Sequence, residues 1–206
     1  LIIPIGEWVL HTACRQHRKW SEQGMDIRMA VNISGKQTTQ QGFLPALARI
    51  IDETGMPPSQ LELELTERVV MGKATEAIRL LHDLKAMGVQ ISIDDFGTGY
   101  SSLSYLKRFP IDKLKIDRSF IMGLPDDQED AAICKSIIAL SSALNLRVIA
   151  EGVETPEQMK FLNNNNCSEM QGYLFSKPFP PDRLVQLDVY SATTASASLG
   201  EHYEGA

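Results

Sequence analysis

Six polar side chains stand near the ends of six short β-forming runs. They are Asn32, Glu64, Asp94, Lys115, Glu151 and Gln171. Successive side chains of a strand point to opposite faces, so alternation along a run shows which residues share a face. In the run 61–65 (LELEL) the leucines share one face and the glutamates the other. The same parity predicts that these polar groups line one polar rim.

Carboxylates gathered on one face repel each other, and each buried charge needs compensation. A bound divalent cation supplies that compensation, and carboxylate and amide oxygens suit Mg²⁺ or Mn²⁺ better than zinc. Asp94 and Asp95 are adjacent, so alternation separates them unless the regular strand ends there. If both reach the rim, the pair suits a site for two metal ions.

A glycine-containing loop follows these aspartates directly. It consists of Phe96, Gly97, Thr98, Gly99, Tyr100, Ser101 and Ser102. One interpretation is a plain connection, because glycine is common in loops. The other is a mobile segment that completes the site when a ligand binds.

Runs rich in β-forming residues alternate with amphipathic helical stretches, a pattern typical of βα units around a parallel sheet. The strands are expected at 27–34, 61–66, 90–94, 113–117, 146–151 and 170–175, and the clearest helices at 6–22, 74–87 and 128–144. Buried parallel strands are normally apolar on both faces, whereas these have one polar face. A closed α/β barrel explains this, because the second face of its strands is the lumen. The active site lies at the rim of that lumen, at the carboxyl ends of the strands.

The composition limits the partners and the compartment. Acidic residues outnumber basic ones by 26 to 20, giving a net charge of -6, which argues against binding polymeric nucleic acid. Cys14, Cys134 and Cys167 are scattered, so we expect buried thiols in a reducing compartment. No membrane-length apolar run or signal peptide is visible. We therefore expect a cytoplasmic protein without membrane contact from this segment.

One domain over residues 1–190 and a disordered tail over 191–206 are expected. The tail is rich in Ala, Ser and Thr and has no periodicity. The chain starts without Met and almost directly in a helical pattern. We therefore expect it to be a fragment.

Taken together, six strings resemble the EAL domain family in order and in spacing, over about residues 1–185. They are 31–34 (VNIS), 64–67 (ELTE), 94–102 (DDFGTGYSS), 112–120 (DKLKIDRSF), 150–154 (AEGVE) and 171–175 (QGYLF). The resemblance implies a (β/α)8 TIM-type barrel that hydrolyses cyclic-di-GMP to linear pGpG with two Mg²⁺ or Mn²⁺ ions. It also implies a homodimer fused to upstream sensory or signalling domains.

The resemblance assigns roles to particular residues. Asn32, Glu64 and Asp94 resemble ligands of the first metal, and Asp94 and Asp95 resemble the carboxylates of the second. Lys115 is similar to the residue that holds and activates the attacking water. Three further residues have implied roles: Glu151 as an essential rim glutamate, Glu67 as a brace for the loop 97–102, and Gln171 as a rim contact.

The sequence departs from the family in one respect, because it contains no Glu-Ala-Leu motif. That motif, with a first-metal glutamate and a phosphate-binding arginine, is expected before Leu1, as is the preceding strand. About six of eight strands are then present, which leaves two unpaired sheet edges.

Three functions are compatible with the sequence. The favoured one is a metal-dependent phosphodiesterase. A catalytically inactive cyclic-di-GMP receptor is the alternative that the missing glutamate and arginine keep open. A third is a barrel enzyme in which Lys115 forms a Schiff base with a carbonyl substrate. Chelation separates the first from the third, and turnover separates the first from the second.

Overall fold

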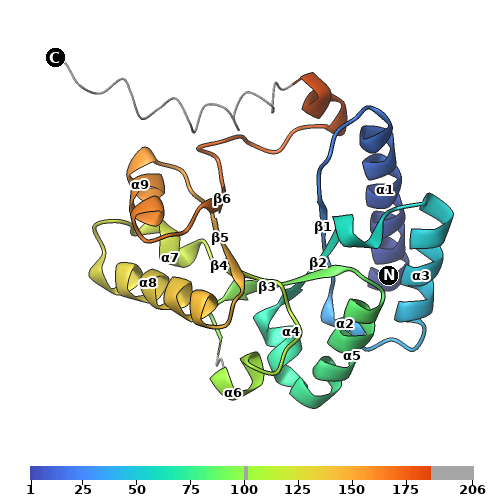
Figure 1. Ribbon diagram of the computed structural model, residues 1–206, viewed down its shortest axis with the longest axis horizontal. Coiled ribbons are helices and arrows are strands. Elements are labelled where there is room, and N and C mark those ends of the chain that lie inside the picture. Colours follow the sequence, from blue (N-terminus) through green and yellow to red (C-terminus); the bar gives the residue numbers. More distant parts are fainter. Residues whose placement is uncertain (100–101, 187–206) are drawn as a thin grey trace. The chain divides into compact units, whose positions relative to one another are not determined.

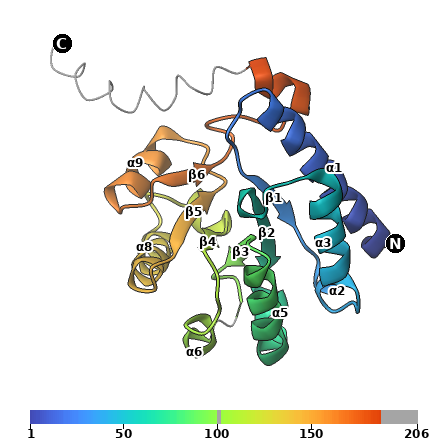
Figure 2. The same cartoon turned by 45° about the vertical axis from the view of Figure 1, so that its right-hand side comes forward.

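The computed structural model describes residues 1–99 and 102–186. Six strands in this part of the chain form one sheet: β1 Met29–Asn32, β2 Leu61–Thr66, β3 Gln90–Phe96, β4 Lys113–Ile116, β5 Arg147–Glu151 and β6 Glu169–Gln171. All five neighbouring pairs are parallel, and the strands follow one another in sequence order. The strands run along an arc with helices on its outer side (Figures 1 and 2). The prediction of a TIM-type barrel, with six strands in this chain, is confirmed as a curled partial barrel.

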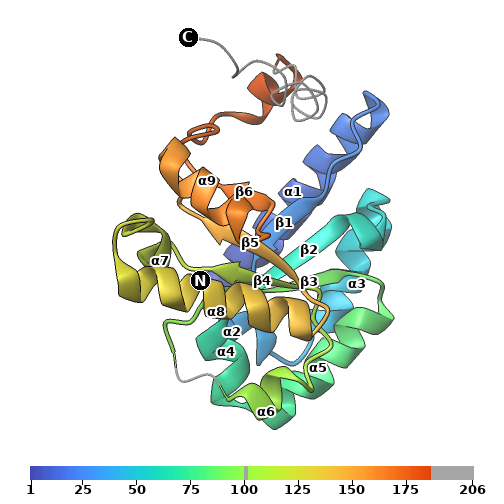
Figure 3. The same ribbon diagram turned by 60° about the vertical axis from the view of Figure 1, so that its left-hand side comes forward.

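Helices connect successive strands. The structure describes α1 Ile2–Glu22, α2 Gly35–Thr38, α3 Phe43–Thr54, α4 Glu67–Gly72, α5 Ala74–Ala86, α6 Leu103–Leu106, α7 Ser119–Met122, α8 Gln128–Ala143 and α9 Pro156–Asn164, with 3-10 turns η1 Pro58–Gln60 and η2 Pro181–Gln186. The three helices expected from the sequence are present, and α1 begins four residues earlier than expected. α8 packs on β4 and β5 (Figure 3).

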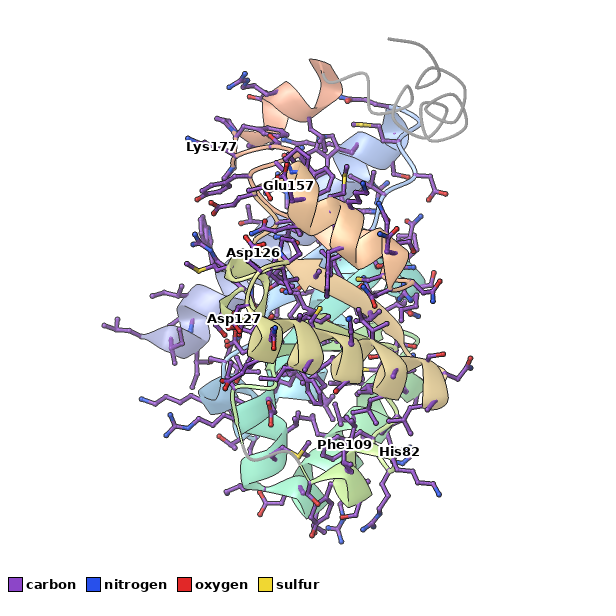
Figure 4. The ribbon with its side chains drawn as sticks, turned by 90° about the vertical axis from the view of Figure 1, so that its left-hand side faces the viewer. His82, Phe109, Asp126, Asp127, Glu157 and Lys177 are labelled. Carbon is purple, nitrogen blue, oxygen red and sulfur yellow. The ribbon has the colours of Figure 1, made fainter. Side chains whose placement is uncertain are left out.

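Acidic and hydroxyl side chains mark the starts of the last two long helices. The Asp127 carboxylate accepts the backbone N–H groups of Glu129 and Asp130 at 2.8 and 3.0 Å and thus caps α8. Thr155 and Gln158 form a reciprocal capping box on α9. Figure 4 shows Asp126 and Asp127 at the start of α8 and Glu157 at the start of α9. Their charges favour the positive ends of the helix dipoles.

The core lies between the apolar face of the sheet and the helices. Leu61, Leu63 and Leu65 of β2 are almost fully buried, as are Ile91 and Ile93 of β3. The alternation in the sequence therefore assigned these faces correctly. Neighbouring strands add further buried residues to the same core: Val31, Leu114, Ile116 and Ala150.

β1 and β6 are the strands that fall furthest short of the prediction, and the prediction of their ends was wrong. β4 and β5 are each one residue shorter than predicted, and β3 continues two residues further, to Phe96. Ile27 and Arg28 lie outside β1 because the pairing with β2 starts at Met29 opposite Leu61. At its other end β1 gives way to the Ser34 cap of α2. β6 ends at Gln171 because the chain turns there, and the Phe175 N–H donates to the Gly172 carbonyl at 3.1 Å.

The cysteines are free and buried, as predicted. Burial raises the pKa of Cys14 to about 11, that of Cys134 to about 12 and that of Cys167 to about 11. Thiols with such pKa values stay protonated near neutral pH, and the thiolate is the reactive form. These cysteines therefore act as small apolar core residues.

The chain divides into two units, Leu1–Ser176 and Lys177–Ala206. The six strands belong to the first unit, and the described part of the second contains η2. The domain end expected at residue 190 and the tail at 191–206 lie outside the described residues. No helix in the described ranges is long and apolar enough to cross a membrane.

Candidate active site

Three carboxylates from different strands converge on one lysine. The ammonium nitrogen of Lys115 on β4 lies 2.7 Å from Glu64 Oε2 on β2 and 3.1 Å from Asp94 Oδ1 on β3. It also lies 2.7 Å from Glu151 Oε1 on β5. The parallel sheet explains the convergence, because parallel strands bring their carboxyl ends to one edge. The structure thus gathers four of the six rim residues expected from the sequence.

Burial strengthens the interactions at this cluster. The exposed fraction is 4% for Lys115, 8% for Glu64 and 9% for Asp94. Burial alone lowers the pKa of a lysine, but hydrogen bonds and ion pairs with Glu151 and Glu64 hold the pKa of Lys115 above its ordinary value. Lys115 is therefore a firmly protonated cation.

The pKa of Glu151 is also shifted, by causes that oppose one another. Burial raises the pKa of Glu151, contact with Lys115 lowers it, and the charges of Asp94 and Glu64 raise it again. The net effect is a pKa above the ordinary value of 4.5. One ammonium thus leaves the three carboxylates incompletely compensated.

A β-bulge turns Asp95 out of regular alternation. Between Ile93 and Phe96 the β3 strand advances three residues while its partner β4 advances two, from Leu114 to Ile116. Asp95 takes up the extra residue in a left-handed conformation with φ 53°. Strands use such bulges to redirect a side chain, frequently beside active sites. The strand does not end at Asp94 as predicted, because β3 continues to Phe96, but the bulge breaks the alternation that would otherwise separate Asp95 from Asp94.

Asp117 is a further member of the acidic cluster that the sequence reasoning did not select. Burial raises the pKa of Asp95, and so do the charges of Asp94 and Asp117 and a hydrogen bond with Asp117. Asp117 also accepts hydrogen bonds from the backbone and the hydroxyl group of Ser119. Its parity with Lys115 was a signal for its position. The residue lies just past the end of β4, where strand parity alone is weaker evidence.

Glu67 contacts the glycine-containing loop. Its carboxylate accepts the backbone N–H groups of Gly97 at 2.9 Å and Gly99 at 3.4 Å. Gly97 has φ 100°, and a Cβ atom there would lie 2.9 Å from the Phe120 ring. The Thr98 hydroxyl donates to the Asp95 carbonyl at 2.8 Å. Phe96 is buried on β3 and Ser102 precedes α6, whereas Tyr100 and Ser101 lie outside the described residues.

Asn32 and Gln171 flank the cluster without joining it. Both are exposed, on the two outer strands of the described sheet. Asn32 lies opposite Glu64 in the strand register, and Gln171 opposite Glu151. The register thus places both at the level of the cluster.

A second ion-pair layer lies one strand pleat below the first. Lys113 Nζ lies 3.2 Å from Glu62 Oε2 and 3.0 Å from Glu169 Oε2, while Arg28 lies 3.8 Å from Glu62. Side chains of both layers line a cavity of about 140 Å³. The phase of Glu62 with Glu64 along β2 was the one sequence signal for this layer, which was not among the predicted site residues. The layer makes the inner face of the sheet polar well below the rim.

The donor set fits a divalent cation in its chemistry. Within the described ranges no three His, Cys, Asp or Glu side chains form a ready-made metal cage, and the carboxylates contact the Lys115 ammonium instead. The available donors are oxygen atoms alone, which Mg²⁺ and Mn²⁺ prefer. Burial is the main cause of the raised pKa of Asp95, and the negative charges of Asp94 and Asp117 raise it further, which indicates excess negative charge beside Asp95. An added cation would relieve that excess.

The fold and the site together define an α/β-barrel domain with an acidic, lysine-centred site at the carboxyl ends of its strands. The EAL domain model matches residues 1–178. The chain belongs to the EAL domain family.

Several relatives carry functional names. The chain is 48% identical over 186 residues to the bifunctional diguanylate cyclase/cyclic di-GMP phosphodiesterase MucR of Pseudomonas aeruginosa, covering 90% of this chain and 27% of MucR. It is 41% identical over 180 residues to the cyclic di-GMP phosphodiesterase PdeR of Escherichia coli, covering 87% of this chain and 27% of PdeR. The chain thus spans about a quarter of the length of these relatives.

A solved structure supports the same assignment. The fold is similar to that of the PaMucR phosphodiesterase in a c-di-GMP complex, with a TM-score of 0.87 and 49% identity. The match covers 89% of this chain and 75% of that chain.

Proposed function

We propose that this domain hydrolyses cyclic-di-GMP to linear pGpG at the cluster centred on Lys115. The observation that carries the proposal is the convergence of Glu64, Asp94 and Glu151 on the Lys115 ammonium within 3.1 Å. Membership of the EAL domain family and the phosphodiesterases among the relatives support the choice of substrate.

The cofactors in this proposal are two Mg²⁺ or Mn²⁺ ions. Asn32, Glu64 and Asp94 would hold one ion, and Asp94 and Asp95 the other. When bound, such ions neutralise negative charge on the phosphodiester during displacement. The carboxylate oxygens and the redirected Asp95 side chain support this ligand set.

The protein side chains act on the attacking water and on the loop. The reaction adds the water oxygen to phosphorus, breaks one ester P–O bond and leaves a phosphomonoester and a free hydroxyl group. Lys115 donates hydrogen bonds that hold the water and stabilise the developing negative charge. Glu151 keeps the Lys115 ammonium in place, Glu67 braces the loop at Gly97 and Gly99, and Gln171 contacts the ligand from the rim.

The Schiff-base alternative fits the structure less well. A lysine that attacks a carbonyl group needs a lowered pKa, so that the amine is neutral. The pKa of Lys115 is raised, because Glu151 and Glu64 bind its ammonium. The inactive-receptor alternative differs from the enzyme only in turnover.

Turnover of cyclic-di-GMP by the purified protein, followed by separation of the products, tests the proposal. We expect pGpG in Mg²⁺ or Mn²⁺, and none in EDTA or with Asp94→Ala. Binding of cyclic-di-GMP without turnover would favour the receptor, and turnover unchanged by EDTA would exclude the metal-dependent mechanism. Exposed Asp126 provides a matched control, because Asp126→Ala also removes a carboxylate.

Three expectations about the whole protein remain proposals. We propose a homodimer, fusion to upstream sensory or signalling domains, and a cytoplasmic location. The relatives, which extend well beyond the matched region, support fusion to further domains. Sizing of the full-length protein tests the homodimer, the residues that precede Leu1 in the full-length protein test the fusion, and fractionation of cells that express it tests the location.

A further inference from the structure

An ion pair joins the two loops that follow β4 and β5. Arg118 Nη2 lies 2.8 Å from Glu154 Oε1. Arg118 directly follows Asp117, and Glu154 is three residues beyond Glu151. The pair therefore connects the loop that follows Lys115 in the chain to the loop that follows its ion-pair partner Glu151.

The stem of Arg118 makes a second contact with the same loop, at Gly152. Gly152 has φ 73°, and its missing Cβ would lie 2.3 Å from Arg118 Cγ and 2.9 Å from Arg118 Cβ. The methylene groups of Arg118 thus rest on the glycine backbone. Glycine is required here both by the left-handed conformation and by this close approach.

The rest of the 152–154 segment is fixed from other directions. Val153 is fully buried, and its N–H donates to the Gln171 carbonyl at 3.0 Å. The Glu154 N–H donates to Gln158 Oε1 at 2.7 Å, which ties the segment to the start of α9, where Glu157 lies (Figure 4). These contacts anchor the segment to β6 and α9. Arg118 anchors it to the end of β4.

We propose that Arg118 is a positioning residue that holds Glu151 against Lys115 by clamping Gly152 and Glu154. The proposal rests on the function proposed above. Glu151 Oε1 lies 2.7 Å from Lys115 Nζ, so a small shift of the loop changes the placement of the ammonium. Small displacements of catalytic groups can cost about 100-fold in rate.

Because the Arg118–Glu154 pair is exposed, its loss should affect the position of Glu151 more than the stability of the fold. The side chains of Arg118 and Glu154 are 53% and 41% exposed. Exposed ion pairs add little stability. Arg118→Ala should therefore fold normally and shift the melting temperature by less than about 4 °C.

The kinetic test uses the purified protein with cyclic-di-GMP and Mn²⁺. Arg118→Ala should lower kcat by about 10-fold while KM changes by less than about 3-fold, because positioning acts mainly on the transition state. Glu154→Ala should have a similar effect, and the double variant should be no worse than either single one. The exchange Arg118→Glu with Glu154→Arg should restore part of kcat. The control is Arg49→Ala, because the exposed Arg49–Glu7 pair lies on α3 and α1.

Amide hydrogen exchange tests the clamp without turnover. Exchange in the 151–155 segment should be faster in Arg118→Ala than in wild type, and unchanged in Arg49→Ala. Unchanged exchange together with unchanged kcat would overturn the proposal. If the wild-type protein shows no turnover, the proposed function fails, whereas the exchange result still decides whether Arg118 holds the segment.

Discussion

At the scale of single residues, Lys115 determines the charge balance of the site. Its ammonium lies within 3.1 Å of three carboxylates that belong to three other strands. Removing one partner of a buried ion pair leaves the others uncompensated and costs about 3–5 kcal/mol. The same lysine therefore affects stability as well as the proposed chemistry, and an experiment must separate the two.

We predict that Lys115→Ala lowers kcat by about 100-fold or more, with a much smaller change in cyclic-di-GMP affinity. Lys115→Arg should restore little activity, because a planar guanidinium does not replace a compact ammonium between three carboxylates. Turnover assays and calorimetry with Ca²⁺ measure the two quantities, and circular dichroism confirms folding. Near-normal kcat, or a loss confined to affinity, would leave Lys115 as a charge-balancing residue.

Asp95 gives a prediction about stability and pH. Burial, Asp94 and Asp117 raise its pKa above 3.8, so its ionisation destabilises the folded protein above the raised pKa. That penalty is absent below the ordinary pKa, where Asp95 is protonated in both the folded and the unfolded state. Asp95→Asn removes the charge, and asparagine tolerates φ 53°.

At pH 8 the metal-free Asp95→Asn variant should therefore melt at a higher temperature than wild type. At about pH 3 the two proteins should melt at similar temperatures. Thermal melts in EDTA at both pH values measure the difference, with exposed Asp126→Asn as the control. A variant that is no more stable than wild type at pH 8 would contradict the raised pKa of Asp95. Its affinity for Mn²⁺ should fall, because a proposed ligand is lost.

At the scale of elements, Asp112 connects β3, α5 and β5. Its carboxylate accepts the Ile91 N–H of β3 at 2.8 Å and contacts Lys85 Nζ of α5 at 2.8 Å. Its backbone pairs with Ile91 and with Arg147 at the start of β5. The side chain thus extends the hydrogen-bond ladder between β3 and β4 beyond the point where β4 begins.

Asp112→Ala should lower the free energy of unfolding by about 1–3 kcal/mol, because the buried Ile91 N–H loses its acceptor. Asp112→Asn should be less harmful, since one oxygen acceptor remains while the ion pair with Lys85 is lost. Urea unfolding curves measure both variants. A loss below about 0.5 kcal/mol in Asp112→Ala, the range of ordinary surface substitutions, would show that water replaces the carboxylate.

The accuracy of the sequence predictions differs from element to element. The alternation in β2 fixed the inward and outward faces, because parity is a local property of a regular strand. The bulge at Asp95 was not predictable from parity, since it depends on the unequal advance of β3 and β4. The early end of β6 also depends on a tertiary contact, which is the close approach of Gly172 to the backbone of Val153. A Cβ atom at Gly172 would lie 2.1 Å from the Val153 carbonyl oxygen.

At the scale of the whole molecule, the described sheet has β1 and β6 as its outer strands. Unpaired strand edges favour association with other chains. α1 adds an exposed apolar surface, in which Trp8 is 67% and Ile5 50% exposed. Both features are sites where copies of this 206-residue chain can meet.

We predict that the 206-residue chain associates in a concentration-dependent manner. The double variant Ile5→Lys with Trp8→Lys should associate less, because it replaces apolar surface with charge. Sizing chromatography at two concentrations measures the effect, and Lys160→Glu serves as a charge-changing control. A wild-type chain that is monomeric at both concentrations would contradict the prediction.

The sequential order of the strands also sets the order in which the charges of the site are synthesised. Each strand pairs with the strand made before it, so a chain emerging from the ribosome can extend the sheet at one growing edge. In this order the carboxylates of Glu64 and Asp94 come first. The ammonium of Lys115 follows 21 residues after Asp94, and Glu151 comes last. A sheet that grows in this order meets two like charges before it gains the ammonium that compensates them.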